Sequence, residues 1–105
     1  RVELLTALRL RRLNTAVDLT EAQENALRPI VEKQVRALAK IRQQRDQSGS
    51  LSRRGRRQLF RQLRRVQRQT DRAIEAELRV EQVEAYRAFR EEQRERWRET
   101  WREQR

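Results

Sequence analysis

Residues 19–41 read LTEAQENALRPIVEKQVRALAKI, and they join a helix start to a long apolar stripe. Thr20 can cap the free backbone N–H groups of a new helix, and Gln23 can reach back to the N–H of the cap residue. Apolar residues then recur at the spacing of one helix face. The stripe consists of Leu27, Ile30, Val31, Leu38 and Ile41, with the polar Gln34 inside it. The sequence therefore predicts a long amphipathic helix over about residues 20–46, kinked at the interior Pro29.

The same spacing predicts a first helix over about residues 2–13. Leu4, Leu5, Leu8 and Leu13 fall on one side of it, and residues 14–18 are expected to form a short connector. Beyond the long helix, Gln47-Ser48-Gly49-Ser50 is the clear interior breaker cluster. It should turn the chain back, with Ser50 or Ser52 capping the next helix.

A third helix is expected over about residues 53–78 and a fourth over about residues 81–105. The apolar stripe of the third helix consists of Leu59, Phe60, Leu63, Val66, Thr70, Ala73, Ile74 and Leu78. No Gly or Pro separates the two segments, so one continuous helix of about 50 residues, spanning ~75 Å, is the alternative. We expect a break near Arg79, on the family resemblance described below.

Composition limits both the fold and the chemistry. The chain has 105 residues, of which 41% are charged and only 35% apolar, with 2 Gly and 1 Pro. We expect one all-α domain over residues 1–105, since a sandwich or barrel would lack its usual turn residues. Cys, His and Met are all missing, which removes thiolate, imidazole and thioether chemistry. We therefore expect no enzyme activity, no catalytic residue, no cofactor and no metal site.

The positive charge is concentrated in one part of the chain. The formal net charge is +11, and residues 48–79 contribute +7 of it, from ten basic and three acidic residues. Residues 80–105 are neutral, with seven of each. Arginines four positions apart repel one another on a helix, and cations near a helix start oppose its dipole. A pattern this unfavourable suggests a binding face for an acidic partner, or else a solvated surface.

Two copies of a short motif give the chain a family resemblance. Leu19-Thr20-Glu21-Ala22-Gln23 resembles the LTxxQ motif of the Spy/CpxP family of bacterial periplasmic stress proteins, and Pro29-Ile30 follows it, as is common in that family. A degenerate second copy is Leu78-Arg79-Val80-Glu81-Gln82, followed by Tyr86. Leu78, Glu81 and Gln82 match the family pattern L-T-P-E-Q. Arg79 and Val80 depart from it, which removes the cap residue of the last helix.

The resemblance implies a fold of four helices, in which long antiparallel helices form a thin, curved, cradle-shaped homodimer. It implies a periplasmic location, reached through an export signal that has been removed. It also implies an ATP-independent holding chaperone that binds unfolded proteins on a basic, partly apolar face. Other relatives repress an envelope-stress sensor kinase, so the resemblance also implies, as an alternative function, a regulatory partner of such a sensor. The metal-sensing branch relies on His or Met ligands, which this chain lacks.

The candidate client-binding residues belong to the third helix. They are Arg53, Arg54, Arg56, Arg57, Phe60, Arg61, Arg64 and Arg65. Trp97 and Trp101, four positions apart, either grip clients, stabilise a dimer or pack on another helix. The main alternative function is an Arg-rich helical nucleic-acid binder, since the net charge meets its electrostatic requirement. A basic helix on an anionic membrane, and a hard-cation site at Asp71/Glu75 or among Glu91, Glu92 and Glu95, are weaker readings.

Overall fold

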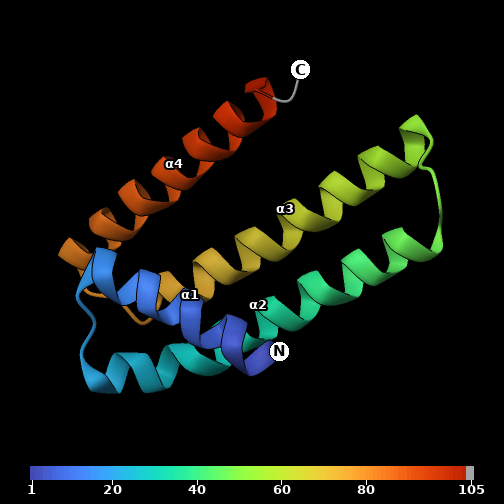
Figure 1. Cartoon of the computed structure of the whole chain (residues 1–105). Helices are drawn as coiled ribbons and strands as arrows, with labels where there is room; N and C mark the ends of the chain where they lie inside the picture. The colour runs from blue at the N-terminus through green and yellow to red at the C-terminus, as the bar shows by residue number, and fades with distance from the viewer. Residues whose placement is uncertain (104–105) are drawn as a thin grey trace.

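The computed structural model describes residues 1–103, and it consists of four α-helices with no strand among these residues (Figure 1). The helices are α1 (Val2–Val17), α2 (Glu21–Gln47), α3 (Arg53–Glu75) and α4 (Val80–Glu103). The molecule is elongated, with extents of 44 × 27 × 21 Å. The all-α prediction and the number of helices are confirmed.

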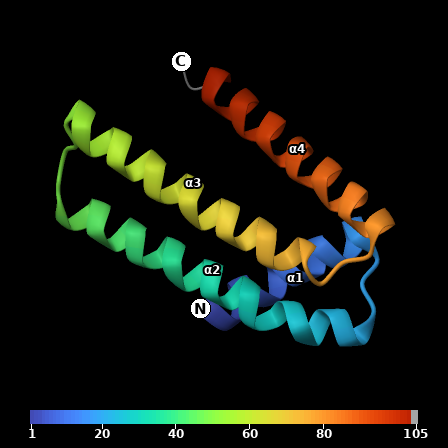
Figure 2. The same ribbon diagram turned by 180° about the vertical axis from the view of Figure 1, so that it is seen from behind.

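The helices are arranged around one antiparallel pair. α2 and α3 run side by side in opposite directions, and α1 packs across the N-terminal half of α2 (Figures 1 and 2). α4 starts beside the C-terminal end of α1 and then diverges from α3 towards its own C-terminus. The C-terminal half of α4 is consequently the least covered helical segment, and its side chains are almost all exposed.

α1 is longer than predicted, and it buries a different face. The expected connector at residues 14–18 is wrong, because the helix continues to Val17. Asn14 ends it from within: its side-chain Oδ1 accepts the Leu19 N–H at 2.8 Å, and Asp18 takes a left-handed conformation with φ of 58°. The buried residues are Thr6, Leu10, Leu13 and Val17. Leu4, Leu5 and Leu8, predicted to face inwards, are 63%, 38% and 42% exposed, because the partner helices cover the other side.

α2 begins and packs as its sequence predicts. Thr20 Oγ1 accepts the Gln23 N–H at 3.1 Å, and Gln23 Oε1 accepts the Thr20 N–H at 3.0 Å, so the capping box is confirmed. Leu27, Val31 and Gln34 are buried as expected, together with Val35, which the prediction missed. The helix is continuous through Pro29, and both views show it changing direction in its N-terminal third (Figures 1 and 2).

α3 and α4 are separate helices. Ser52 caps α3 by accepting the Gly55 N–H at 3.1 Å, which selects it over Ser50. α3 ends at Glu75, three residues earlier than predicted, and the break near Arg79 is confirmed over the continuous-helix alternative. The expected end of α4 at residue 105 lies outside the described residues.

The hydrophobic core is small and lies towards one end of the molecule. It is formed by Leu10, Leu13, Val17, Leu19, Leu27, Val31, Val35, Ile74 and Tyr86. Every residue in this set comes from α1, the part of α2 up to Val35, the end of α3 or the start of α4, apart from Leu19 in the α1–α2 connection. Residues 42–50 and most of the first half of α3 are exposed. We call the end of the molecule that holds this core the motif end. We call residues 42–65 the loop end.

Candidate functional site

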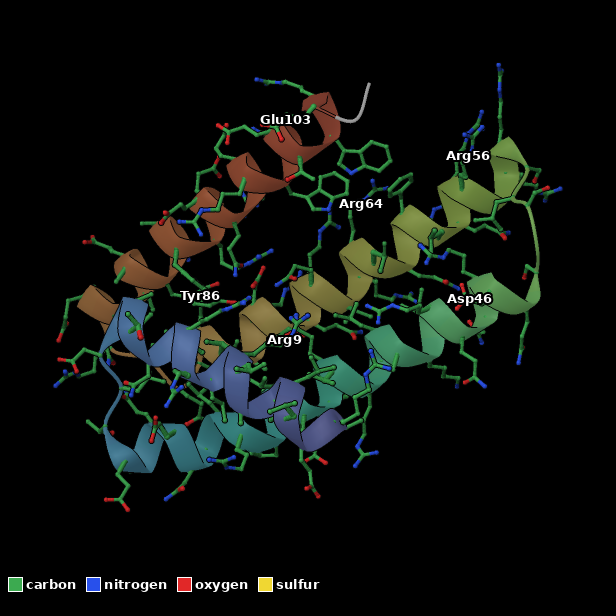
Figure 3. The ribbon with its side chains drawn as sticks, in the orientation of Figure 1. Arg9, Asp46, Arg56, Arg64, Tyr86 and Glu103 are labelled. Atoms are coloured by element: carbon green, nitrogen blue, oxygen red, sulfur yellow. The ribbon has the colours of Figure 1, made fainter. Side chains whose placement is uncertain are left out.

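The predicted client-binding residues all lie on α3, and every one of them is exposed. Phe60, the apolar member of the set, is 37% exposed. Arg56 lies near the loop at the start of α3, whereas Arg64 lies farther along, on the side where α3 faces the C-terminal half of α4 (Figure 3). The set therefore extends over roughly the first half of the helix rather than converging on one point.

Part of this set gathers around one surface depression. Arg61, Arg64 and Arg65 line a shallow depression of about 700 Å³ together with Arg68 and Arg72. We call these five residues the basic row. Its remaining lining residues are Gln58, Gln62 and Gln69, so the surface holds no acidic and no apolar side chain. Arg53, Arg54, Arg56, Arg57 and Phe60 do not line it.

The predicted set omitted two members of the basic row, Arg68 and Arg72. Their spacing from Arg61 and Arg65 is i, i+4, i+7 and i+11, which places all four on one helix face. That periodicity was available in the sequence, and it extends the basic surface by about two further turns towards the C-terminal end of α3.

The basic row has no counter-charge of its own. Eight ion pairs join described residues, and none involves an arginine between positions 53 and 72. The acidic residues nearest in sequence, Asp71 and Glu75, pair instead with Arg90 at 3.1 Å and Arg87 at 2.7 Å. The positive field of α3 is therefore directed to solvent, where it can act over a Debye length of ~8–10 Å.

The acidic candidates for a hard-cation site are all engaged by arginine. Glu91, Glu92 and Glu95 pair with Arg94, Arg96 and Arg98 at 2.7, 2.8 and 2.5 Å. Within residues 1–103, no three acidic side chains converge on a point where a metal ion could bind. The C-terminal half of α4 is thus a self-neutralised surface, in keeping with the equal numbers of acidic and basic residues in this part of the chain.

Two large aromatic side chains stand in solvent on α4. Trp97 and Trp101 are 57% and 47% exposed, and their ring centroids lie 5.4 Å apart at an interplanar angle of 59°. Helical spacing puts them on the same face as Tyr86 and Arg90, which bond to Asp71 of α3. The divergence of α4 from α3 therefore leaves this aromatic pair without a covering helix.

The two motif copies meet at the motif end and form one hydrogen-bonded unit. Gln23 Nε2 donates to Gln82 Oε1 at 2.7 Å, and Gln82 Nε2 donates to Gln23 Oε1 at 2.9 Å. Gln23 also donates to the Glu77 carbonyl, and Gln82 to the Asp18 carbonyl. Each glutamine accepts a second bond from the N–H at the start of its own helix. Both side-chain amides are therefore fully satisfied.

The remaining motif residues support this unit rather than a chemical site. Leu19 is buried and Leu78 is partly buried against the core. Thr20 caps α2. Glu81 is the exception, because it points to solvent and pairs with the equally exposed Arg79 at 3.3 Å. The motif thus joins the start of α2 to the start of α4 and fixes both interhelical connections.

Tyr86 links the core to a polar network. Its hydroxyl donates to Asp71 Oδ1, which also accepts from Arg90 and from Gln67. Burial of the phenol raises the pKa of Tyr86 well above its ordinary value, and the hydrogen bond to Asp71 raises it further. The neutral phenol is therefore the form that the folded protein favours.

Comparison of the chain with protein-family models, curated proteins and solved structures finds no match. The Spy/CpxP-like resemblance accordingly rests on the residues of the two motif copies. None of the helices within residues 1–103 has the length and apolar character that crossing a bilayer requires.

Proposed function

We propose that this protein is an ATP-independent holding chaperone of the Spy/CpxP-like class, acting in the bacterial periplasm. One observation carries the proposal: a row of arginines without any acidic partner lies on the same helix as the exposed Phe60. An unfolded chain offers both carboxylates and apolar side chains. A helix that presents a row of guanidinium groups, with an aromatic ring one turn from Arg64, can contact both.

The charge and the aromatic group act at different ranges. The field of the basic row raises the encounter rate with acidic segments over about a Debye length. Arg64 follows Phe60 by one helical turn, so both side chains can contact the same client segment. Guanidinium groups pair with carboxylates and also stack on aromatic rings. Many weak contacts of this kind retain a client without fixing its conformation and without nucleotide.

A homodimer is part of the proposal. Leu4, Val80 and Trp101 are between 47% and 79% exposed in the single chain. A second copy would cover apolar area of this kind, and the core of one chain is thin. Size exclusion coupled to light scattering tests this part, and we expect twice the mass of the 12.9 kDa chain. A monomer at all concentrations would contradict it.

The test of holding activity is aggregation of a chemically unfolded, neutral client, followed by light scattering without ATP. We expect suppression at stoichiometric ratios that fades as salt is added. Replacing Arg61, Arg64, Arg65 and Arg68 by Glu should abolish it. The matched control replaces four exposed bases of α2, Arg28, Arg36, Lys40 and Arg45, by Glu, which changes the net charge by the same amount. Circular dichroism checks that both variants remain helical.

Equal protection by wild type and the α3 variant would overturn the assignment of the site. Equal loss in both variants would show that net charge, and not the basic row, drives binding. The absence of suppression at every ratio would remove the chaperone function.

A second function is favoured by the composition of the basic row itself. Five arginines and three glutamines line the depression, with no acidic or apolar side chain among them, and form a surface suited to phosphate groups. Arg-rich helices bind structured RNA. A salt titration of RNA affinity separates the two functions, because each neutralised phosphate adds to the dependence on salt. The nucleic-acid-binding function would be favoured if the wild type bound RNA tightly, the α3 variant lost this binding, and the wild type did not suppress client aggregation.

A further inference from the structure

A separate pocket lies among the four helices, away from the basic row. It has a volume of about 250 Å³. Its walls combine apolar side chains, Leu5, Leu8 and Phe89, with the guanidinium groups of Arg9, Arg12 and Arg90. Gln34, Gln67 and Gln93 supply further polar groups. No acidic residue lines it.

The charges around the pocket are unbalanced. Arg90 is neutralised, since its Nε lies 3.1 Å from Asp71 Oδ1. Arg9 donates to the neutral Gln34 at 3.2 Å, and neither Arg9 nor Arg12 forms an ion pair within residues 1–103. Two guanidinium groups therefore face one small cavity without an anion.

The electrostatics of Arg9 reflect this crowding. Desolvation lowers the pKa of its guanidinium, and the charges of Arg12, Arg90 and Arg42 lower it further. An anion seated between Arg9 and Arg12 would offset the repulsion among these arginines and would form charge-assisted hydrogen bonds. The pocket is thus arranged to gain from a negative group.

The pocket does not end at this cavity. Arg12, Phe89 and Gln93 also line a groove of about 750 Å³ between α1 and α4, which continues past Thr15 and Ala16 to Trp97 and Thr100. A ligand with its anion in the pocket would have its remainder in this groove. That continuity favours an extended chain over a free small acid.

We propose that the pocket binds the C-terminal carboxylate of a polypeptide whose last side chain is apolar, with the preceding residues lying in the α1/α4 groove. Arg9 and Arg12 hold the carboxylate, and Leu5, Leu8 and Phe89 contact the last side chain. The volume suffices, because a cavity of about 150 Å³ already accepts benzene. Capture of a chain terminus by converging donors is an established mode of peptide recognition. This site does not depend on the holding function or on the basic row.

The experiment uses the full chain with Trp101→Phe, so that Trp97 in the groove is the only tryptophan reporting binding. The probe is a short acetylated peptide that ends in leucine with a free carboxylate. The first control peptide has the same sequence but ends in a C-terminal amide. A third peptide has the amide and an internal aspartate, which restores the net charge but not the terminus. N-acetyl-leucine has the terminal carboxylate and the leucine side chain but no preceding residues, so it tests whether the pocket alone is sufficient for binding.

We expect the free-carboxylate peptide to shift the tryptophan emission and to bind about tenfold or more tightly than both amides. N-acetyl-leucine should bind more weakly than the peptide, because it leaves the groove empty. Arg9→Gln combined with Arg12→Gln should weaken the affinity for the free-carboxylate peptide by about tenfold or more. Arg28→Gln with Lys40→Gln removes the same charge on the exposed side of α2 and should leave the affinity unchanged.

A variant that adds a carboxylate provides an independent check. Leu8→Glu places an anion beside Arg9 and Arg12 and should block the peptide. Ala7→Glu adds the same charge on the opposite, exposed side of α1 and should not. Equal affinity for the free-carboxylate peptide and the aspartate-containing amide peptide would overturn the proposal. So would unchanged peptide binding by a folded Leu8→Glu variant. Equal affinity for N-acetyl-leucine and the peptide would overturn the role of the groove.

Discussion

The motif end and the loop end satisfy their polar groups in opposite ways. At the motif end, Gln23 and Gln82 use every donor and acceptor of their amides on each other and on the adjoining backbone. At the loop end, the arginines that begin α3 have no acidic partner and are left to water. The core also lies at the motif end. The comparison indicates that stability resides at one end, which leaves the other free to carry charge.

The largest expected effect breaks the motif end. Leu27 is fully buried in the core, so Leu27→Ala should lower the free energy of unfolding by ~2–5 kcal/mol, through lost burial and the cavity left behind. Leu59 at the loop end is only partly buried, so Leu59→Ala is the matched control. It should lower the free energy of unfolding by clearly less. Urea titration followed by circular dichroism measures both. Equal losses would contradict the division between the two ends.

The next effect concerns the glutamine pair. Gln82→Leu keeps the side-chain size but leaves the Gln23 amide and the Asp18 carbonyl short of partners, which should cost ~1–3 kcal/mol. Gln23→Leu should act similarly. The double variant should lose less than the two single variants together, since the remaining unpaired amide is also removed. Additive losses in a double-mutant cycle would show that the two side chains do not form one unit.

Alkaline pH should weaken the motif end through Tyr86, the sole tyrosine of the chain. Burial and Asp71 raise its pKa in the folded state, so its contribution is fully present below the unfolded pKa of ~10 and is lost as pH rises above it. The loss should approach ~1.4 kcal/mol per pH unit. Unfolding free energies of wild type and Tyr86→Phe, measured from pH ~9 to ~11, test this. Parallel curves would contradict it.

A smaller effect sharpens the comparison between the two helix starts inside the motif end. α2 has both halves of its capping box, whereas α4 has the Gln82 half alone, because Arg79 stands at the cap position. Arg79→Thr should supply the missing hydroxyl and raise the melting temperature, with a stabilisation of up to ~1 kcal/mol. Thr20→Ala is the reverse experiment and should cost ~0.5–2 kcal/mol. No gain from Arg79→Thr would mean that the glutamine pair alone fixes the start of α4.

The smallest effect is expected at the loop end. Arg61→Gln with Arg65→Gln removes an i, i+4 repulsion, so stability should stay constant or rise by a few tenths of a kcal/mol. The difference from wild type should shrink as salt screens the charges. Denaturant titrations at low and high salt measure it. A clear destabilisation would show that these arginines stabilise the fold, which would contradict their assignment as residues that serve binding alone.

Local sequence was sufficient for several of these features. The capping box at Thr20 and Gln23, and the α3 cap at Ser52, depend on neighbouring residues alone, and both predictions are confirmed. The inner face of α1 could not be predicted in the same way, because leucines occur on two sides of that helix and only its partners select one. The continuation through Asn14 was missed because its side chain acts as a terminator from inside the helix.

The candidate sites divide in the same manner. The arginines of α3 can be predicted from their periodicity, which the predicted set follows only as far as Arg65. The pocket around Arg9 was not predictable, since its walls come from all four helices and exist only once these are packed. The Gln23–Gln82 contact joins residues 59 positions apart, and no local pattern specifies such a pairing.

That separation has a consequence for the order in which the chain folds. Closing a loop of this length costs more entropy than pairing α2 with α3, which are neighbours along the chain. The second glutamine also lies in the last quarter of the sequence, so it leaves a ribosome or a translocation pore after the basic row does. We expect the arginine-bearing pair to form first and the junction of the two motifs to close last, as the step that completes the native state.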